Sequence, residues 1–456
     1  MNPEIFRAYD IRGIAGKDLT EESIYKIGRA AGTYMIRKYG RNLVVGRDNR
    51  THGEKLQKSF IIGLIESGCN VTNINLATSP MIYWTVCKYE FDGGMNITAS
   101  HNPKEYNGIK VVAKNAHSVC GDELREILRI ALSEDFEEGV GNLEEREIAS
   151  GYNLELLSKI FLQRPLKIVV DAGNGTTGAF APELFRAAGC EVHELYCDLD
   201  GTFPNHEANP ESAENLADLS AKVAEIGADL GIGFDGDGDR VGIVDEKGKH
   251  YSADYLLILL ARDLLARHPG ETIIFDTKTS KIVENDIRNR GGEPLRYKTG
   301  HSFIETKMKE IGSLLAGECS GHMFIGENYY GFDDAFLATL KILEIISRSD
   351  KAFSEHFQDL ETLITTPEIK LACPDNKKFE VVKKLVADFQ RDHKTLTIDG
   401  AFVEFDDKNW GAVRCSNTTP CLTLRFEAET EEKLAEMKHT FAQKLVKHPE
   451  IDMSSF

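Results

Sequence analysis

The sequence predicts an α/β protein in which three related α/β domains with mixed sheets are followed by a smaller α+β domain. The first observation behind this prediction is a pattern that occurs at residues 43–74, 166–195 and 272–297. In each repeat an apolar, β-branched run ends at Gly or Asp, an amphipathic helix follows, and a second apolar run comes next. The second observation is the spacing, since the repeats begin roughly 105 to 125 residues apart, which is the size of a domain and not of a solenoid repeat.

A glycine ends the predicted helix of every repeat. The three residues are Gly68, Gly189 and Gly292. Glycine is the usual residue at a helix end because it adopts the left-handed conformation without steric cost. We therefore expect these three glycines to be left-handed C-caps.

An unusual polar loop follows the next apolar strand of each unit. These loops are GGMNITASHNP (93–103), ADLGIGFDGDGDR (228–240) and GSLLAGECSGH (312–322). In open α/β sheets, the loops at the carboxyl ends of the strands build the functional site. We expect the three loops to meet at one cleft.

The pattern changes after about residue 365. Residues 398–405 and 413–428 read as strands, and an amphipathic helix is predicted from about Thr430 to Lys447. The acidic, glycine-containing stretch 133–150 is interpreted as a surface connection. The predicted domains are listed in chain order: 1–147, 148–250, 251–365 and 366–456.

Composition excludes some classes of function. The 456 residues carry 54 Lys and Arg against 73 Asp and Glu, a formal net charge of −19. This charge argues against nucleic-acid binding, although it leaves room for a local basic pocket. The apolar run 255–261 is too short to span a bilayer, and no apolar signal region follows the N-terminal residues. We therefore expect no membrane partner. Nine cysteines without a C-x-x-C pair favour a reduced, cytoplasmic protein.

The loop Asp235-Gly236-Asp237-Gly238-Asp239-Arg240 predicts a metal site. The glycines allow tight folding, so that three carboxylates converge on one point. Their mutual repulsion is relieved by a hard divalent cation such as Mg²⁺ or Ca²⁺. An EF-hand is disfavoured because Arg240 stands where that motif needs Gly and because the flanks read as strands. A solvated acidic turn is the other alternative.

The loop Thr98-Ala99-Ser100-His101-Asn102-Pro103 offers a hydroxyl beside an imidazole. A hydrolase nucleophile is one interpretation, but neighbouring side chains rarely point at each other and the G-x-S-x-G elbow is absent. A second interpretation is that Ser100 carries a phosphoryl group, with Lys110 on the next strand supplying charge or a proton. An ordinary turn is equally compatible with the sequence.

Two further stretches carry polar groups suited to a phosphosugar. Glu318, Ser320 and His322 alternate with small residues, as expected of groups that bind sugar hydroxyls. In the last domain, RCSNTTP (414–420) begins with a guanidinium that matches phosphate oxygens. A surface loop is the default interpretation of each stretch alone.

The sequence GNGTTG (173–178) is a competing signal. It follows a strand, opens a helix and matches the dinucleotide fingerprint, so an NAD-dependent oxidoreductase is an alternative function. Asp171 at the strand end would oppose a pyrophosphate, and the other repeats place polar turns at the same point. The loop is therefore better interpreted as one version of a repeated turn. A non-catalytic Ca²⁺-binding module is the third alternative.

Taken together, the loops resemble those of the α-D-phosphohexomutase family, in its phosphomannomutase/phosphoglucomutase branch. The resemblance spans the chain and includes YDIRG (9–13), the T-A-S-H-N-P loop, the D-G-D-G-D-R loop, G-E-x-S-G-H and R-x-S-N-T-x-P. It implies four domains around a central cleft. It also implies an isomerase of carbohydrate metabolism that interconverts hexose 6-phosphate and hexose 1-phosphate through a phosphoserine and a hexose 1,6-bisphosphate.

The resemblance also implies roles for single residues. Ser100 would carry the phosphoryl group, and Asp235, Asp237 and Asp239 would hold Mg²⁺ together with a phosphate oxygen on Ser100. Lys110, His101 and Arg12 would act in acid/base or charge stabilisation. Substrate contacts would come from Tyr9, Arg12, Arg240, Lys278, Lys298, His301, Glu318, Ser320, His322, Arg414, Ser416, Asn417 and Thr418.

Two positions depart from the family's pattern, and a third bears on its branch. Thr419 replaces the Glu usual before the last Pro, which puts the geometry of the phosphate loop in doubt, and Cys319 replaces a Met or Gln. Asn417 favours mannose and glucose phosphates over the alternative, a phosphoglucosamine mutase. The expected partners are hexose phosphates, the expected cofactors are Mg²⁺ and hexose 1,6-bisphosphate, and the protein is expected to be a monomer or homodimer.

Overall fold

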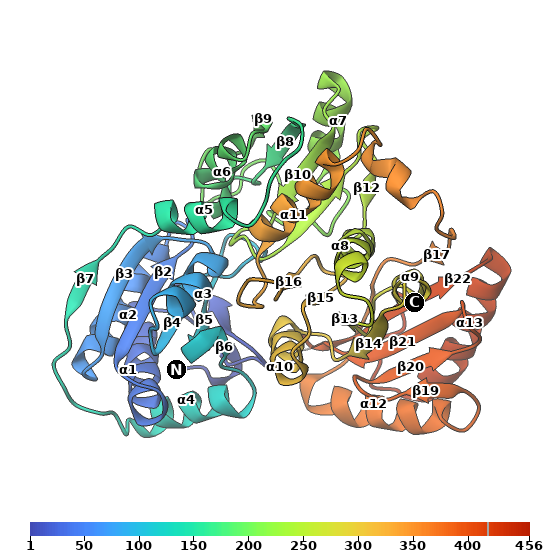
Figure 1. The fold of residues 1–456 in the computed structure, drawn as a ribbon. Helices are drawn as coiled ribbons and strands as arrows, with labels where there is room; N and C mark the ends of the chain where they lie inside the picture. Colours follow the sequence, from blue (N-terminus) through green and yellow to red (C-terminus); the bar gives the residue numbers. More distant parts are fainter. Residues whose placement is uncertain (417–418) are drawn as a thin grey trace.

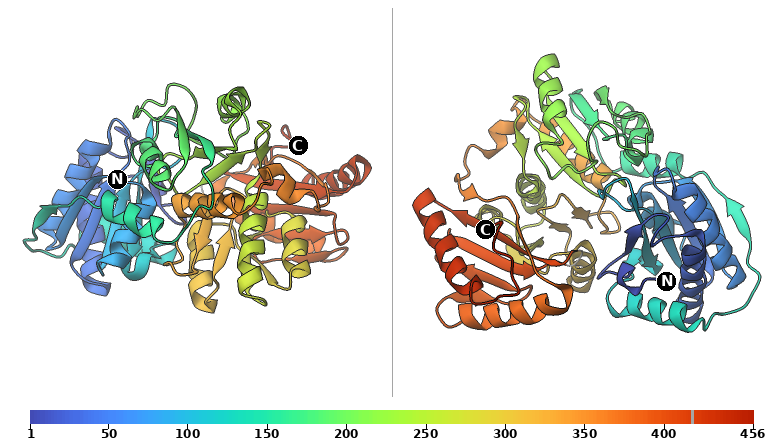
Figure 2. Two further views of the ribbon diagram at one scale, coloured as in Figure 1. Left: turned by 45° about the horizontal axis from the view of Figure 1, so that its top comes forward. Right: turned by 180° about the vertical axis from the view of Figure 1, so that it is seen from behind.

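The structure is a computed structural model that describes residues 1–416 and 419–456. Its strands form separate sheets that follow one another along the chain, each covered by helices (Figure 1). The first sheet and the last lie at opposite ends of the molecule, with the second and third between them (Figures 1 and 2). The predicted fold class, an α/β protein with three related units and a C-terminal α+β unit, is confirmed.

The first unit has the sheet order β1-β5-β4-β2-β3-β7, with β6 beside β5. Thr20 caps α1 by accepting a hydrogen bond from Ser23 N (3.1 Å). The elements are a 3-10 helix (Pro3–Ile5), β1 (Ile11–Ile14), α1 (Glu21–Lys38), β2 (Asn42–Arg47), α2 (Gly53–Glu66), β3 (Asn70–Leu76), α3 (Ser79–Lys88), β4 (Gly93–Ile97), β5 (Tyr106–Ala113), a 3-10 helix (Lys114–Ala116), β6 (His117–Ser118), α4 (Asp122–Ser133) and β7 (Leu143–Glu145).

The second unit has the order β12-β11-β10-β8-β9. Its core strand β8 is buried from Ile168 to Asp171, as expected for a parallel strand between two helical layers. The elements are α5 (Ala149–Leu157), β8 (Lys167–Asp171), a 3-10 helix (Thr176–Ala179), α6 (Ala181–Ala187), β9 (Glu191–Leu195), α7 (Ala217–Ile226), β10 (Leu230–Phe234), β11 (Val241–Val244) and β12 (His250–Tyr251).

The third unit has the order β14-β13-β15-β16. Asp334 caps α11 through hydrogen bonds from Phe336 N and Leu337 N (both 3.0 Å). The elements are α8 (Ala253–Arg267), β13 (Thr272–Asp276), α9 (Lys281–Asn289), β14 (Glu293–Tyr297), α10 (His301–Ile311), β15 (Leu315–Gly317), β16 (Met323–Ile325), α11 (Ala335–Ser347) and a 3-10 helix (Phe353–Phe357).

The last unit has the order β17-β22-β21-β20-β19, with β18 beside β22, and the pairs are antiparallel. Its sheet begins at Ile364, which pairs with Ala428. The elements are β17 (Ile364–Thr365), β18 (Ile369–Ala372), α12 (Asp375–Phe389), β19 (Lys394–Leu396), β20 (Ala401–Glu404), β21 (Trp410–Cys415), β22 (Cys421–Ala428) and α13 (Glu431–Leu445).

The three repeats share one topology. In each, the two strands of the predicted β-α-β pattern pair in parallel: β2 with β3, β8 with β9, and β13 with β14. The next strand of each unit (β4, β10, β15) joins the first in parallel and then pairs antiparallel with its successor (β5, β11, β16). The sheets are therefore mixed, and a polar loop connects the antiparallel pair in each unit.

Two local predictions need correction. Gly68 and Gly189 are left-handed, at φ +98° and +101°, but the left-handed residue after α9 is Gly291 (φ +78°) and not Gly292. Gly292 is needed for another reason, because a Cβ there would lie 2.7 Å from Leu265 on α8. The connection at 133–150 is also not a plain loop, because it contains β7, which pairs with β3.

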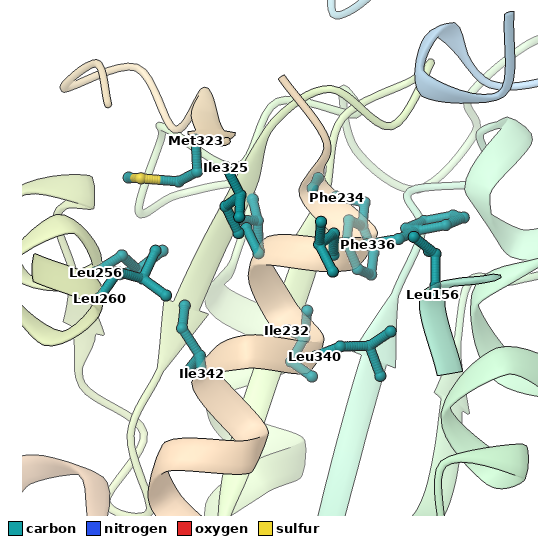
Figure 3. Packing of buried hydrophobic residues seen from close by; sticks show 14 of the residues in the cluster. Leu156, Ile232, Phe234, Leu256, Leu260, Met323, Ile325, Phe336, Leu340 and Ile342 are labelled. Atoms are coloured by element: carbon teal, nitrogen blue, oxygen red, sulfur yellow. The ribbon is translucent and has the colours of Figure 1, made fainter. Parts of the chain in front are cut away.

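A shared core joins the units. α11 packs between α8 and β16 of its own unit and the second unit's β10 and α5 (Figure 3). The rings of Phe336 and Phe234 meet edge to face at 5.3 Å between centroids. Such aromatic contacts add to the burial of apolar area, so they stabilise the contact between the second and third units. Among the helices of the described ranges, none has both the length and the apolar character needed to cross a membrane.

Candidate active site

The three polar loops approach one another as expected. Ser100, after β4, donates a hydrogen bond from its Oγ to Oδ2 of Asp235, after β10, at 2.7 Å. The backbones also touch, because a Cβ on Gly236 would lie 2.5 Å from the carbonyl oxygen of Ser100. Arg240 Nε donates to Nε2 of His322, in the loop after β15, at 2.9 Å. The sheet topology thus brings a serine, three aspartates and a histidine together.

The loop 235–240, called the metal loop for the ion that it could hold, contains three buried carboxylates. Oxygens of Asp235, Asp237 and Asp239 lie within 4.8 Å of one another, and all three side chains are fully buried. Asp235 Oδ1 accepts hydrogen bonds from Gly238 N (2.9 Å) and Asp239 N (3.1 Å), which fixes the turn. Gly238 is left-handed at φ +77°, which a glycine adopts without strain. The EF-hand interpretation is wrong, because strands β10 and β11 flank the loop.

Lys110 enters the carboxylate cluster from β5. Its Nζ donates to Asp237 Oδ2 at 2.8 Å and also contacts Asp239. Burial opposes the charge on Lys110, but the charges of Asp237 and Asp239 outweigh it and raise the pKa of the ammonium. For Asp235, burial and the neighbouring carboxylates raise the pKa. With all three aspartates ionised, the cluster therefore carries more negative charge than Lys110 and Arg240 supply as positive charge.

The carboxylates fit a hard cation. Within residues 1–416 and 419–456, Oδ1 of Asp237 and Oδ1 of Asp239 are buried without a hydrogen-bond partner. A buried carboxylate oxygen without a partner is costly, and a divalent cation bound to it removes that cost. The donors are all oxygens, as Mg²⁺ and Ca²⁺ prefer. This acidic cluster can bind a metal.

The serine loop has an unusual backbone. Ser100 is left-handed at φ +51°, a conformation that non-glycine residues adopt rarely and often at functional sites. This turn folds His101 back, so that its Nδ1 lies 3.2 Å from Ser100 Oγ. The expectation that these neighbouring side chains point apart was wrong for that reason. Burial lowers the pKa of His101, which favours the neutral imidazole.

The N-terminal motif lies beside the serine loop. Arg12 donates to Asn102 Oδ1 at 2.7 Å and is paired with Asp10. The ring of Tyr9 packs edge to face against His301, with centroids 5.2 Å apart. Tyr9 thus connects the first unit to the third across the cleft, while Arg12 is held within the first unit.

His322 and His301 form a stacked pair. Their centroids are 5.4 Å apart, and His322 Nδ1 lies 2.8 Å from Asp333 Oδ2. Burial lowers the pKa of His322 to about 3 and that of His301 to about 4. The lowered pKa values favour neutral imidazoles, so this pair adds little charge to the cleft.

The loop after β15 contributes Glu318, whose Oε1 accepts a hydrogen bond from Gly300 N at 2.6 Å. Burial raises the pKa of Glu318 to about 8, and the charge of Asp276 adds to this effect. Lys278 lies nearby and pairs with Glu368 at 2.8 Å. Lys298 differs from the other predicted contacts, since its side chain is exposed beside Phe303 and lies outside the described lining of the cleft.

The last unit contributes Arg414, whose Nε donates to Asp399 Oδ2 at 2.7 Å. Ser416 Oγ and Thr419 Oγ1 lie 2.8 Å apart, so Thr419 supports the loop through its hydroxyl. The predicted contacts Asn417 and Thr418 lie outside the described residues.

A cleft of about 590 Å³ lies between the units. Residues from all four units line it, and many are basic or polar. The lining includes these predicted residues: Tyr9, Arg12, His101, Arg240, Lys278, His301, Glu318, Ser320, His322, Arg414 and Ser416. A protein of net charge −19 therefore has a cleft with several cations, which suits an anionic ligand.

Sequence reasoning missed the residues that support the site. Ser79 donates to Asp237 Oδ2 at 2.6 Å, Asp333 Oδ2 lies 2.8 Å from His322 Nδ1, and Arg50 donates to backbone carbonyls of the serine loop. The only signal in the sequence was the polar turn after each buried strand, which contains Arg50 in the first unit.

The glycine loop at 173–178 has a structural role. Asn49 N of the first unit donates to Thr176 Oγ1 at 3.0 Å, and a Cβ on Gly178 would lie 2.2 Å from the carbonyl oxygen of Cys197. The loop is thus packed against neighbouring backbone. It offers no support for a dinucleotide site.

The fold defines a class, namely multidomain α/β proteins in which three related units and a C-terminal unit enclose one polar cleft. Comparison with known proteins identifies the family. Four domain models of phosphoglucomutase/phosphomannomutase match in order: the α/β/α domain I at 3–138, domain II at 148–248, domain III at 252–363 and the C-terminal domain at 368–444. The chain belongs to the phosphoglucomutase/phosphomannomutase family, as the resemblance predicted.

Individual relatives support the same family assignment. The chain is 44% identical over 443 residues to a phosphomannomutase/phosphoglucomutase of Pseudomonas aeruginosa, covering 97% of this chain and 95% of the relative. It is 41% identical to a phosphoglucomutase of Neisseria meningitidis, covering 98% of each chain. A crystal structure of a family protein from Burkholderia thailandensis superposes with a TM-score of 0.92 at 38% identity, covering 98% of this chain and 97% of that one.

Proposed function

We propose that the protein is an isomerase that interconverts hexose 6-phosphate and hexose 1-phosphate, with mannose or glucose as the sugar. The observation that carries this proposal is the hydrogen bond from Ser100 Oγ to Asp235, in a loop whose three carboxylates can bind a metal. This arrangement places a hydroxyl that can carry a phosphoryl group beside the charges that such a group requires. The names of the relatives, phosphomannomutase/phosphoglucomutase and phosphoglucomutase, support the same reaction.

Asp235, Asp237 and Asp239, with a phosphate oxygen on Ser100, would hold Mg²⁺. The bound ion would supply charge neutralisation at the phosphoryl group. The fit is supported by the buried oxygens of Asp237 and Asp239 that lack partners among the described residues.

Phosphoryl transfer leaves a protein mainly the tasks of positioning and charge stabilisation. The hydroxyl oxygen at the free end of a hexose monophosphate forms a bond to phosphorus, while the bond from phosphorus to Ser100 Oγ breaks. The hydroxyl proton passes to a base, and Ser100 Oγ regains a proton. His101 lies 3.2 Å from Oγ and is neutral, so it is suited to exchange that proton, while Lys110, Arg12 and Arg240 offset negative charge.

The resulting hexose 1,6-bisphosphate must turn in the cleft before its other phosphate returns to Ser100. Glu318, Ser320 and His322 would hold sugar hydroxyls during both steps, with His301 and Lys278 beside them. Arg414 and Ser416, together with Asn417 and Thr418, would grip the phosphate that does not react. We further propose that residues 1–147, 148–250, 251–365 and 366–456 act as four domains, and that the last moves to release its grip.

The relatives support the choice of sugar. Five relatives at 40% identity or more carry the names phosphomannomutase/phosphoglucomutase or phosphoglucomutase. A mutase of N-acetylglucosamine phosphate superposes with a TM-score of 0.61 at 14% identity, a likeness of fold alone. Mannose and glucose phosphates are therefore the proposed substrates in preference to glucosamine phosphate.

A coupled assay tests this proposal. Purified protein with Mg²⁺ and a trace of hexose 1,6-bisphosphate is given mannose 1-phosphate, glucose 1-phosphate or glucosamine 1-phosphate. Formation of mannose 6-phosphate or glucose 6-phosphate is expected. Turnover of glucosamine 1-phosphate alone, or of none of the three, would contradict it.

A further inference from the structure

The side chain of Arg50 lies beneath the serine loop and is almost completely buried, with 1% of its surface exposed. It follows β2 in the polar turn of the first repeat. All five N–H groups of its guanidinium have an acceptor, which is the full capacity of the group. Nε donates to Asp48 Oδ2 at 3.1 Å, and the four remaining N–H groups donate to backbone carbonyls.

Those four carbonyls belong to one short stretch of chain. The NH2 group donates to the carbonyl oxygens of Ser100 (2.8 Å) and Asn102 (2.5 Å). The NH1 group donates to those of Pro103 (2.7 Å) and Tyr106 (3.1 Å). A single side chain therefore holds the serine loop from Ser100 to the start of β5.

The loop needs such a support for two reasons. Ser100 is in the left-handed region, which its side chain disfavours, so neighbouring contacts must fix it. In addition, the Ser100 carbonyl faces Gly236 of the metal loop closely enough that a Cβ there would lie 2.5 Å away. The position of this carbonyl therefore sets how Ser100 Oγ meets Asp235.

The second unit closes over the guanidinium. The ring of Phe203 lies 5.1 Å from Arg50 Cζ, and a Cβ on Gly201 would lie 2.9 Å from Arg50 Cα. A side cavity of about 240 Å³ reaches both Arg50 and Ser100. The hydrogen bonds of Arg50 thus lie where the first unit, which supplies the serine, meets the second unit, which supplies the aspartates.

We propose that Arg50 is a positioning residue for phosphoryl transfer at Ser100, acting through the four carbonyls of the serine loop. This role rests on the proposed mutase function. Arg50 does not touch the reacting atoms; it fixes the backbone from which Ser100 Oγ is presented to the metal loop. Lysine cannot replace it, because an ammonium has three donors and no planar fork.

The test compares Arg50→Lys and Arg50→Met with Arg29→Met. Arg29 is a suitable control because it is also a buried arginine of the first unit that binds a backbone carbonyl, that of Glu137 at 3.0 Å, away from the serine loop. Wild-type mutase activity is measured first, and its absence would overturn the proposed function together with this role. If Arg50→Met does not fold, the kinetics of Arg50→Lys alone test the positioning role.

A misplaced nucleophile costs about 100-fold in rate. We therefore expect Arg50→Lys to lower kcat by about 100-fold with little change in KM, and to slow Ser100 phosphorylation by hexose 1,6-bisphosphate, followed by intact mass, to a similar degree. Arg29→Met should lower Tm but keep kcat. Wild-type kcat in folded Arg50→Lys would overturn the proposal.

Chemical rescue separates positioning from stability. In Arg50→Ala, millimolar guanidinium chloride can enter through the side cavity and should raise kcat, whereas sodium chloride at the same ionic strength should not. A purely structural role would give no such recovery, because guanidinium does not stabilise a weakened fold. Equal effects of the two salts would count against Arg50 as a positioning residue.

Discussion

The ammonium of Lys110 donates a hydrogen bond to Asp237 at 2.8 Å, in the centre of the acidic loop. Both side chains are buried, so neither charge is screened by water. Lys110 and Arg240 together do not neutralise three ionised aspartates, and the pKa of Asp235 is raised by burial and by the neighbouring carboxylates. The site is therefore electrostatically incomplete until a cation binds.

The first prediction follows from that deficit. Chelation with EDTA should abolish mutase activity and Mg²⁺ should restore it. Asp237→Asn should weaken Mg²⁺ binding by about tenfold or more, because a neutral amide replaces a charged ligand. Titration calorimetry on the purified protein measures this directly.

Asp245→Asn is the matched control. Asp245 is a buried aspartate of the same unit that accepts hydrogen bonds from Lys247 N (2.9 Å) and Lys249 N (2.8 Å). It should keep wild-type Mg²⁺ affinity. Full activity of metal-free protein in excess chelator would rule out the metal assignment.

The second prediction concerns the phosphate that does not react. Arg414 lines the cleft, and a charged hydrogen bond is worth roughly 1.5–3 kcal/mol, so Arg414→Ala should lower kcat/KM by about ten- to a hundredfold. Arg414→Lys should recover part of this loss, since a point charge lacks the planar fork. Steady-state kinetics on glucose 1-phosphate measures both.

Arg391→Ala serves as its control, because Arg391 belongs to the same unit but its side chain is 75% exposed. Its kinetics should match the wild type. If Arg414→Ala behaves like Arg391→Ala on each hexose phosphate, the last unit does not clamp the phosphate.

The site illustrates what sequence can and cannot predict. The alternation of Asp and Gly in 235–239 predicts converging carboxylates because short spacing fixes their geometry locally. Arg50 could not be found in this way, because its partners are backbone carbonyls about 50 residues further along, which no side-chain pattern encodes. The same holds for Asp333, whose contact with His322 depends on the pairing of β15 with β16 and the turn that follows.

The fold was predictable for related reasons. The β-α-β repeats were visible because apolar periodicity and closing glycines are local signals. The sequence did not predict that Gly291, and not Gly292, is the left-handed residue after α9. Gly292 is required instead by close packing against Leu265, which lies on a different helix. Strand β7 was missed because its residues are exposed and pair only at the edge of the first sheet.

The third prediction concerns pH and Glu318. Its pKa of about 8 in the folded protein exceeds the usual value of 4.5. Between these two values the folded state binds more protons than the unfolded state, so Glu318 makes the free energy of unfolding fall as pH rises, by up to about 1.4 kcal/mol per pH unit.

The neutral variant Glu318→Gln removes this titration. Without substrate, the Tm of the wild type relative to Glu318→Gln should fall as pH rises from about 4.5 to about 8. Thermal melts of both proteins across this window measure the difference. A difference that stays constant would show that Glu318 titrates near its ordinary value, and one that grows with pH would show a pKa below that value; either contradicts the prediction.

The central claim is that Ser100 carries the phosphoryl group. Its most direct measurement is the intact mass and phosphosite map of the protein after incubation with hexose 1,6-bisphosphate and Mg²⁺. We expect one phosphate on Ser100 of the wild type, no adduct on Ser100→Ala, and loss of mutase turnover by several orders of magnitude in that folded variant. Phosphate on another residue, or near-normal turnover by Ser100→Ala, would contradict the phosphoserine mechanism.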